Sequence, residues 1–121
     1  MTKTITEING TRIAILDSDA AIITDRQSAI DLVAALIYED DCGGAIIGKT
    51  AFDESMFTLS SGLAGEVLQR FTSYRVRLAI VGDFEQYTSK PLRDFIRESN
   101  RGGHVAFVAD LEAAHAVFAT L

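Results

Sequence analysis

Two adjacent hydroxyl side chains, Ser60 and Ser61, stand where an apolar stretch passes into an amphipathic helical pattern. The first turn of a helix has unsatisfied backbone N–H groups and carries the positive end of the helix dipole, so it favours a phosphate or another anion. Gly62 follows the serines, and Glu66 lies one helical turn further along. We therefore expect a phosphoacceptor or a site for a small anionic ligand at this helix start.

A second group of polar residues follows the apolar run that ends at Gly82. Asp83 and Phe84 come directly after this run, and Arg93 lies near the start of the next expected helix. Open α/β sheets bind ligands at the carboxyl edge of their strands, so we expect Asp83 and Arg93 to share one surface with the serines. The expected binding surface comprises Ser60, Ser61, Gly62, Glu66, Asp83, Phe84 and Arg93. The alternative is local, because serine and aspartate also cap helices and stabilise loops through their own hydrogen bonds.

No segment carries a complete catalytic or metal-binding motif. His104 and His115 have no cysteine or carboxylate at metal-ligand spacing, and the chain lacks a Gly-x-Ser-x-Gly elbow. The run Gly48-Lys49-Thr50 resembles the end of a phosphate-binding loop but lacks the first glycine at the required spacing. We assign no catalytic residue, metal ligand or cofactor and expect a protein that works by binding. An enzyme or small-molecule-binding protein with its site at the same strand edge is the alternative.

The elements that position these residues begin with a β-hairpin. Asn9-Gly10 supplies the positive backbone angles of a tight primed turn between two strand-like runs. A two-residue turn predicts the pairs Ile8 with Thr11, Glu7 with Arg12, and Ile5 with Ala14. A capping box formed by Thr24 and Gln27 predicts a helix that follows to about Glu39.

Three further apolar runs, 45–48, 78–82 and 105–109, predict parallel strands covered on both faces. Helical periodicity predicts helices over about 62–73, 90–100 and 111–121. The fold expected for residues 1–121 is a single α/β domain: a small mixed, mostly parallel sheet with an N-terminal β-hairpin and about four helices. Glycine near a helix start costs about 1 kcal/mol relative to alanine, and we expect close packing against the sheet to explain Gly62 and Gly65.

The composition and charge of the chain exclude some classes of binding partner. The chain has 121 residues, is 48% hydrophobic and carries a formal charge of -6, with its basic residues scattered along the sequence. This distribution argues against nucleic acid and against an anionic membrane surface. It leaves a partner protein, a small anionic ligand or a second copy of the chain. The lone Cys42 and the absence of an apolar leader are typical of a cytoplasmic protein.

The order of expected elements resembles the STAS fold of anti-sigma factor antagonists. In that family a short motif before the second helix reads aspartate, serine or threonine, serine, glycine, leucine, and its first hydroxyl is the phosphorylated switch. The run from Met56 to Leu63 matches this place, with Ser60 at the phosphoacceptor position and Leu59 where the family has aspartate. The resemblance implies a regulatory or protein-interaction module that phosphorylation switches.

Over its C-terminal two thirds the chain resembles a bacterial family catalogued as domain of unknown function 4180. The resemblance lies in the runs 61–66, 68–71, 78–84 and 94–100. It implies family membership and adds no activity to the expectations above.

Overall fold

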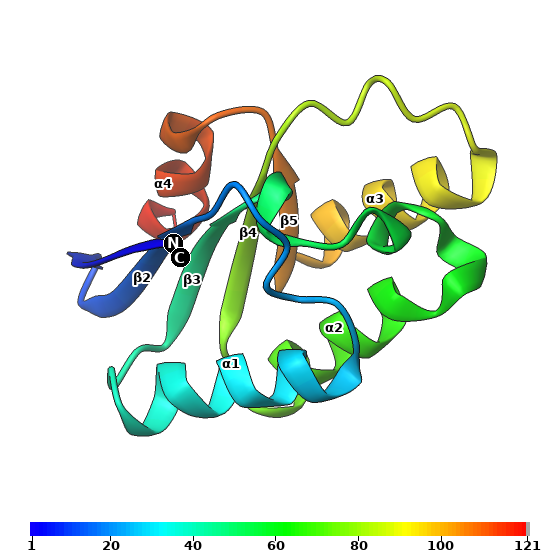
Figure 1. The fold of residues 1–121 in the computed structure, drawn as a ribbon. Coiled ribbons are helices and arrows are strands. Elements are labelled where there is room, and N and C mark those ends of the chain that lie inside the picture. The colour runs from blue at the N-terminus through cyan, green and yellow to red at the C-terminus, as the bar shows by residue number, and fades with distance from the viewer. Residues whose placement is uncertain (121) are drawn as a thin grey trace.

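The computed structural model describes residues 1–120 as one five-stranded sheet flanked by helices (Figure 1). Leu121, the last residue of the helix expected at 111–121, lies outside the described residues. The strands lie side by side in chain order: β1 (Thr2–Ile8), β2 (Thr11–Asp17), β3 (Gly44–Gly48), β4 (Arg77–Val81) and β5 (Val105–Val108). The β1–β2 pair is antiparallel and all later pairs are parallel, which confirms the predicted mixed sheet with the hairpin at one edge.

Four α-helices and three short 3-10 turns complete the described chain. The helices are α1 (Arg26–Tyr38), α2 (Leu63–Ser73), α3 (Lys90–Gly102) and α4 (Leu111–Ala119). The 3-10 turns, η1 (Lys49–Ala51), η2 (Glu54–Phe57) and η3 (Leu59–Ser61), all lie between β3 and α2. Each helix begins and ends within about two residues of its predicted bounds, apart from the undescribed terminus.

The hairpin has the predicted register. Asn9 and Gly10 have φ values of 52° and 82°, which are the left-handed angles a two-residue primed turn requires. The structure pairs Ile8 with Thr11, Glu7 with Arg12, and Ile5 with Ala14. The turn residues therefore determine which side chains of β1 and β2 share a face.

The capping box of α1 lies one residue later than predicted. Asp25, not Thr24, is the cap: its carboxylate accepts the Ser28 N–H at 2.8 Å, and the Ser28 hydroxyl accepts the Asp25 N–H at 3.1 Å. Gln27 instead donates to Asp31 on the next turn. A carboxylate at the positive end of the helix dipole is favourable, and the hydrogen bond from the Ser28 backbone lowers the pKa of Asp25.

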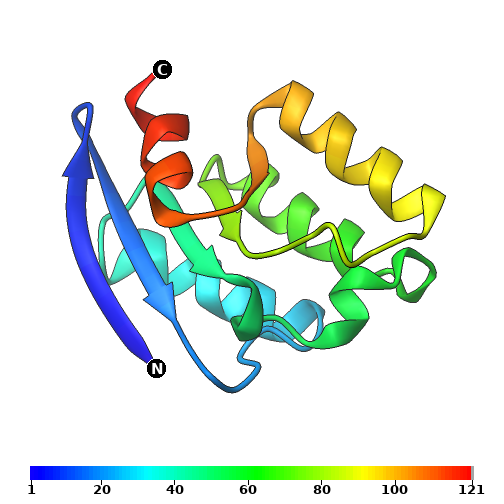
Figure 2. The same cartoon turned by 90° about the horizontal axis from the view of Figure 1, so that it is seen from above.

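The helices divide unequally between the two faces of the sheet (Figure 2). Because the parallel strands follow one another in chain order, crossovers of the same hand place α1, α2 and α3 around the same core, which contains Val33, Phe71, Ile80 and Leu92. Of the described helices, α4 alone covers the other face, where Phe118 packs against strand residues such as Ile46. Within residues 1–120, no helix has the length and apolar character needed to cross a bilayer.

Candidate functional site

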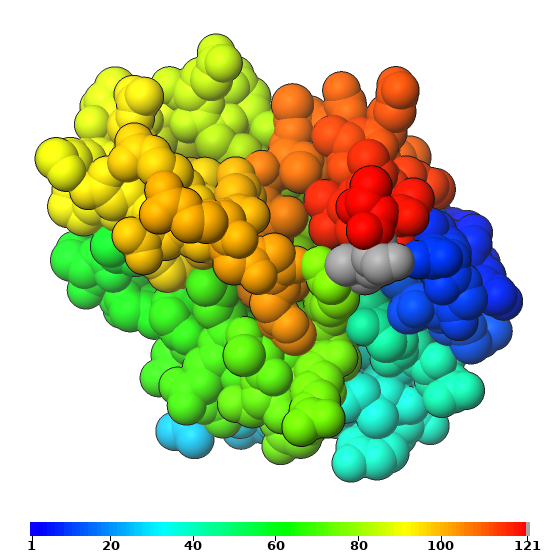
Figure 3. All heavy atoms as spheres, turned by 180° about the vertical axis from the view of Figure 1, so that it is seen from behind, coloured from blue at the N-terminus to red at the C-terminus, as the bar shows by residue number. Residues whose placement is uncertain are grey.

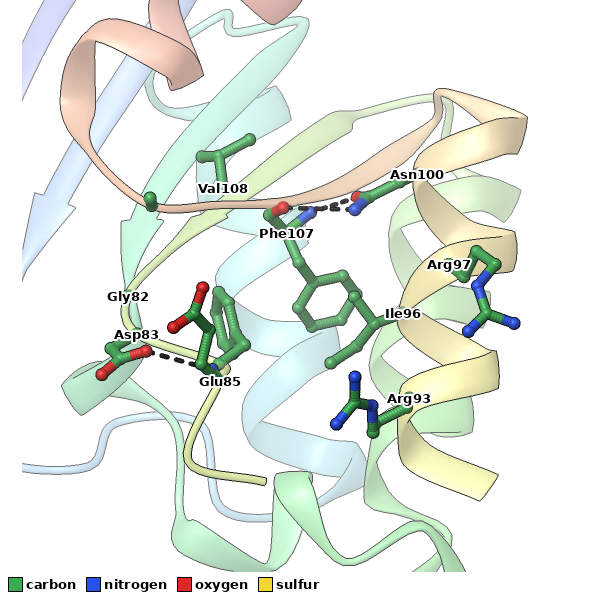
Figure 4. Close-up of a pocket in the computed structure, with 11 residues that line it drawn as sticks. Gly82, Asp83, Glu85, Arg93, Ile96, Arg97, Asn100, Phe107 and Val108 are labelled. Atoms are coloured by element: carbon green, nitrogen blue, oxygen red, sulfur yellow. Dashed lines mark hydrogen bonds between the residues drawn. The ribbon is translucent and has the colours of Figure 1, made fainter. Parts of the chain in front are cut away.

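A solvent-open hollow lies between the loop after β4, helix α3 and the end of β5 (Figure 4). We call it the α3–β5 groove; its volume is about 710 Å³. It brings together Asp83, Phe84 and Arg93 from the expected binding surface. The lining comprises Gly82, Asp83, Phe84, Glu85, Arg93, Ile96, Arg97, Asn100, Phe107, Val108 and Ala109.

The floor of the groove is apolar and well packed. The Phe107 ring meets Phe84 edge-on at 5.2 Å between centroids, and it meets Phe95 of α3 at 6.2 Å. Ile96 lies beside Phe107 in the close-up (Figure 4). Interlocking rings from the loop, the strand and the helix hold these three elements together, so the groove is a preformed feature of the fold.

The two walls carry opposite charges. Asp83 and Glu85 lie on the loop side, and Arg93 and Arg97 project from α3 (Figure 4). The Asp83 carboxylate accepts the Glu85 N–H at 3.0 Å, which stabilises the loop, and Arg97 pairs with Asp94 at 3.1 Å on its own helix. Among the described residues, no carboxylate pairs with the Arg93 guanidinium. The walls therefore face each other without an ion pair between them.

Asn100 lines the groove and bonds to the edge of the sheet. Its side-chain carbonyl accepts the Phe107 N–H at 2.7 Å, and its amide group donates to the Phe107 carbonyl at 3.3 Å. In the described chain β5 has a strand neighbour on one side only, so the side chain takes the place of a missing strand at Phe107. The sequence pattern predicts that Asn100 or Gly102 ends this helix in the left-handed conformation. The left-handed C-cap is instead Gly103, with φ 79°.

The remaining expected residues lie in two other hollows. Ser61, Gly62 and Glu66 line a hollow of about 340 Å³ between the starts of α1 and α2. Ser60 lines a hollow of about 510 Å³ together with Phe57, Thr58, Leu59, Ser89 and Pro91. The structure thus distributes the seven expected residues over three separate hollows.

The two serines differ in their surroundings. The Ser61 hydroxyl donates to the Ser55 carbonyl at 2.6 Å and accepts the Leu63 N–H at 3.2 Å, so it links η2 to the start of α2. Ser60 is exposed, and its hydroxyl contacts no hydrogen-bond partner within the described chain. Glu66 forms a 3.8 Å ion pair with Arg26 of α1, which gives it a partner on the neighbouring helix.

Close packing does not explain the two glycines at this helix start. A Cβ atom at Gly62 or Gly65 would have no neighbouring atom within 4 Å, so the expected packing role is wrong for both. Gly62 has φ 84°, a left-handed conformation that favours glycine. Nothing in the structure explains Gly65.

Lys49, which the sequence pattern places only in an incomplete phosphate-loop motif, helps to hold one wall of the groove in place. Its ammonium lies 4.8 Å from the Tyr87 ring centroid and 5.4 Å from that of Phe57, and these two rings stack at 5.1 Å. The Tyr87 hydroxyl donates to Glu54 at 2.9 Å. These contacts attach the loop that forms one wall of the α3–β5 groove to η2. Only the fold brings residues 49, 54, 57 and 87 together.

The described residues contain no group of three or more histidine, cysteine, aspartate or glutamate side chains arranged to hold a metal ion. No curated protein and no solved structure shows a significant match to this chain. A family model described as "Domain of unknown function (DUF4180)" matches residues 8–118, nearly the whole sequence. The chain therefore belongs to the DUF4180 family.

Proposed function

We propose that this domain is a binding protein for a small anionic ligand and that the α3–β5 groove is its site. The observation that carries the proposal is a preformed apolar floor between a basic wall and an acidic wall that do not neutralise each other. Met56 and Phe57, which a flat apolar docking surface would expose, are buried. Concave, partly apolar hollows with a few convergent polar groups are the usual form of a small-molecule site.

The charged walls indicate the class of ligand. Arg93 has no competing carboxylate within the described chain, so its planar guanidinium is available for two parallel hydrogen bonds to a carboxylate or phosphate. Asp83 and Glu85 on the facing wall favour a hydrogen-bond donor and disfavour a second anion. The groove therefore suits a small anion that also carries an amine or hydroxyl group, with its apolar part against Phe107.

The groove supports binding better than catalysis. Its lining contains no serine, cysteine, histidine or lysine, and so it lacks the usual nucleophile and base pairs. The carboxylates of Asp83 and Glu85 are the acid–base groups of this lining, and Asp83 already accepts a backbone hydrogen bond. An enzyme would need further groups from its substrate or from a partner.

The test is titration with orthophosphate, citrate and glutamate, monitored by calorimetry and by amide chemical shifts of the labelled protein. We expect at least one anion to shift the amides of Phe107 and Val108, and Arg93→Gln to weaken its binding about tenfold or more. Arg101→Gln is the matched control, because it removes the same charge from the last turn of α3, outside the groove. Shifts elsewhere, or equal affinity for Arg93→Gln and the parent, would refute the assignment.

A second candidate function rests on Ser60. We infer a STAS-like regulatory module of the bacterial cytoplasm, in which phosphorylation of Ser60 alters binding of a partner protein. The supporting observation is an exposed hydroxyl without a partner in the described chain, beside an apolar hollow that includes Phe57, Leu59 and Pro91. A phosphate would add a charge of about -1.5 to -2 to this surface. Ser61 is a poorer acceptor because both of its hydrogen bonds hold local structure.

Mass spectrometry of the protein purified from its native cell tests this candidate. We expect phosphate on Ser60 and none on Ser61, and we expect Ser60→Ala to abolish the modified species. Phosphate restricted to Ser61, or its absence under all growth conditions, would argue against the switch. Neither result bears on the α3–β5 groove, because the two sites are separate.

A further inference from the structure

Strand β1 forms an open edge of the sheet. It pairs with β2 without interruption from Thr2 to Ile8 and has no described strand on its other side. It lies at the outer margin of the molecule in Figures 2 and 3. Natural proteins protect such an edge with a proline, a bulge, a covering segment or charged side chains; β1 has neither proline nor bulge, and its charged side chains are Lys3 and Glu7.

The hydrogen bonds of β2 show which peptide groups of β1 face outward. The Arg12 carbonyl accepts the Gly43 N–H at 3.0 Å, so the peptide groups of Arg12 face β3. In an antiparallel pair, the residue opposite Arg12 must likewise face away from β2, and that residue is Glu7. By alternation along the strand, Lys3, Ile5 and Glu7 present their backbone N–H and C=O groups at the open edge.

We propose that this edge binds a second copy of the chain, with the two β1 strands antiparallel about a two-fold axis at Ile5. This register places Lys3 opposite Glu7 of the other copy, Thr4 opposite its Thr6, and Ile5 opposite its Ile5. All outward-facing peptide groups from Lys3 to Glu7 then find partners, and the two five-stranded sheets become continuous.

Charge complementarity selects this register over the others that the backbone allows. Centring the pair on Lys3 places two lysines opposite each other, and centring it on Glu7 does the same with two glutamates. A shift to a centre at Thr4 or Thr6 leaves each charge opposite an uncharged side chain. Only the centre at Ile5 creates two opposite-charge pairs, and it also pairs the whole strand with the least overhang.

Both charged side chains are available for this contact. The Lys3 ammonium donates to Asp40 at 2.8 Å within its own chain, which leaves two of its three donors, and a third of its side chain is exposed (33%). Glu7 is exposed, and no cation in the described chain pairs with it. Lys3, Ile5 and Glu7 share one face of the strand, with Ile5 packed against the core.

Sedimentation equilibrium over a range of protein concentrations tests the proposal. We expect the parent to dimerise and Glu7→Lys to weaken the dimer about ten- to a hundredfold, because two attractive pairs become repulsive. Lys3→Glu should weaken it similarly. An equimolar mixture of these two variants should dimerise again, because positions 3 and 7 are then both acidic in one chain and both basic in the other, and each cross-strand pair is attractive.

Glu98→Lys is the matched control, since it makes the same charge change on an exposed position of α3 and should leave the dimer unaffected. Circular dichroism checks the fold of Lys3→Glu, which also loses its ion pair to Asp40. A monomeric parent at every concentration would overturn the proposal. So would a dimer that tolerates Glu7→Lys, or a variant mixture that stays monomeric.

Discussion

Asn100 offers the sharpest test of how the α3–β5 groove is held together. Its side chain makes one short hydrogen bond of 2.7 Å and one long hydrogen bond of 3.3 Å to the backbone of Phe107, a residue that is 6% exposed. Asn100→Ala removes both and leaves an edge N–H and C=O without a protein partner. An unsatisfied buried polar group costs about 1 to 3 kcal/mol. Because the groove is open to solvent, water can replace part of the lost bonding, and we expect a total loss of about 1 to 2 kcal/mol.

Urea denaturation and hydrogen exchange measure this effect together. A loss of that size should lower the urea midpoint and, in a separate thermal melt, the melting temperature by roughly 4 to 8 °C for a domain of this length. The Phe107 amide should exchange faster while amides in β3 keep their relative protection. Glu98→Ala, an exposed change on the same helix, is the control and should leave stability near that of the parent. If Asn100→Ala unfolds at the same urea concentration as Glu98→Ala, with unchanged exchange at Phe107, the side chain does not support the strand edge.

Three further predictions concern the core, the glycines and the thiol. Ile80 is 0% exposed, so Ile80→Ala should cost about 2 to 5 kcal/mol in chemical denaturation, and a parent-like midpoint would contradict its place in the core. A Cβ atom at Gly82 would lie 2.7 Å from the Lys49 Cβ, so Gly82→Ala should destabilise by about 1 to 3 kcal/mol. Gly65→Ala, with no neighbour within 4 Å, should stabilise by about 0.5 to 1 kcal/mol, and calorimetric melting of the two variants compares these opposite signs. Burial, and then the charge of Asp40, raise the pKa of the Cys42 thiol. The unfolded thiol therefore ionises first as pH rises. The free energy of unfolding should then fall more steeply above the usual thiol pKa in the parent than in Cys42→Ala, as urea titrations at alkaline pH would show.

The fold follows from local signals in the sequence. Asn9-Gly10 specifies the turn and hence the pairing of β1 with β2, and apolar runs between helical patterns specify parallel strands. The error at the start of α1 is also local. Thr24 and Asp25 are both good caps, and the choice depends on whether Gln27 or Ser28 reaches back, which residue types alone do not settle.

The candidate site is predictable only in part, because its geometry depends on loops whose sequences show no helical or strand periodicity. The segment between β3 and α2 folds into three 3-10 turns, and its Ser60 and Ser61 line other hollows than Asp83. Open α/β sheets usually bind ligands where successive crossover helices diverge to opposite faces of the sheet. The described chain has no such point, because its three crossover helices all pack around one core. The groove forms instead beside the edge strand β5. The clamp of Asn100 on Phe107 has no signature in the sequence.

The lone helix α4 has a consequence for how the protein folds during synthesis. Since the strands lie in chain order, each new strand after the first finds its neighbour already made, and the sheet can grow as the chain emerges. The core that contains α1, α2 and α3 can therefore form while the chain is still being synthesised. The opposite face stays uncovered until the last helix is complete, which leaves Ile13, Ile46 and Ala79 exposed to solvent in every shorter nascent chain. Chains that stop before α4 should therefore bind chaperones more readily than chains that contain it, although they already contain the whole sheet.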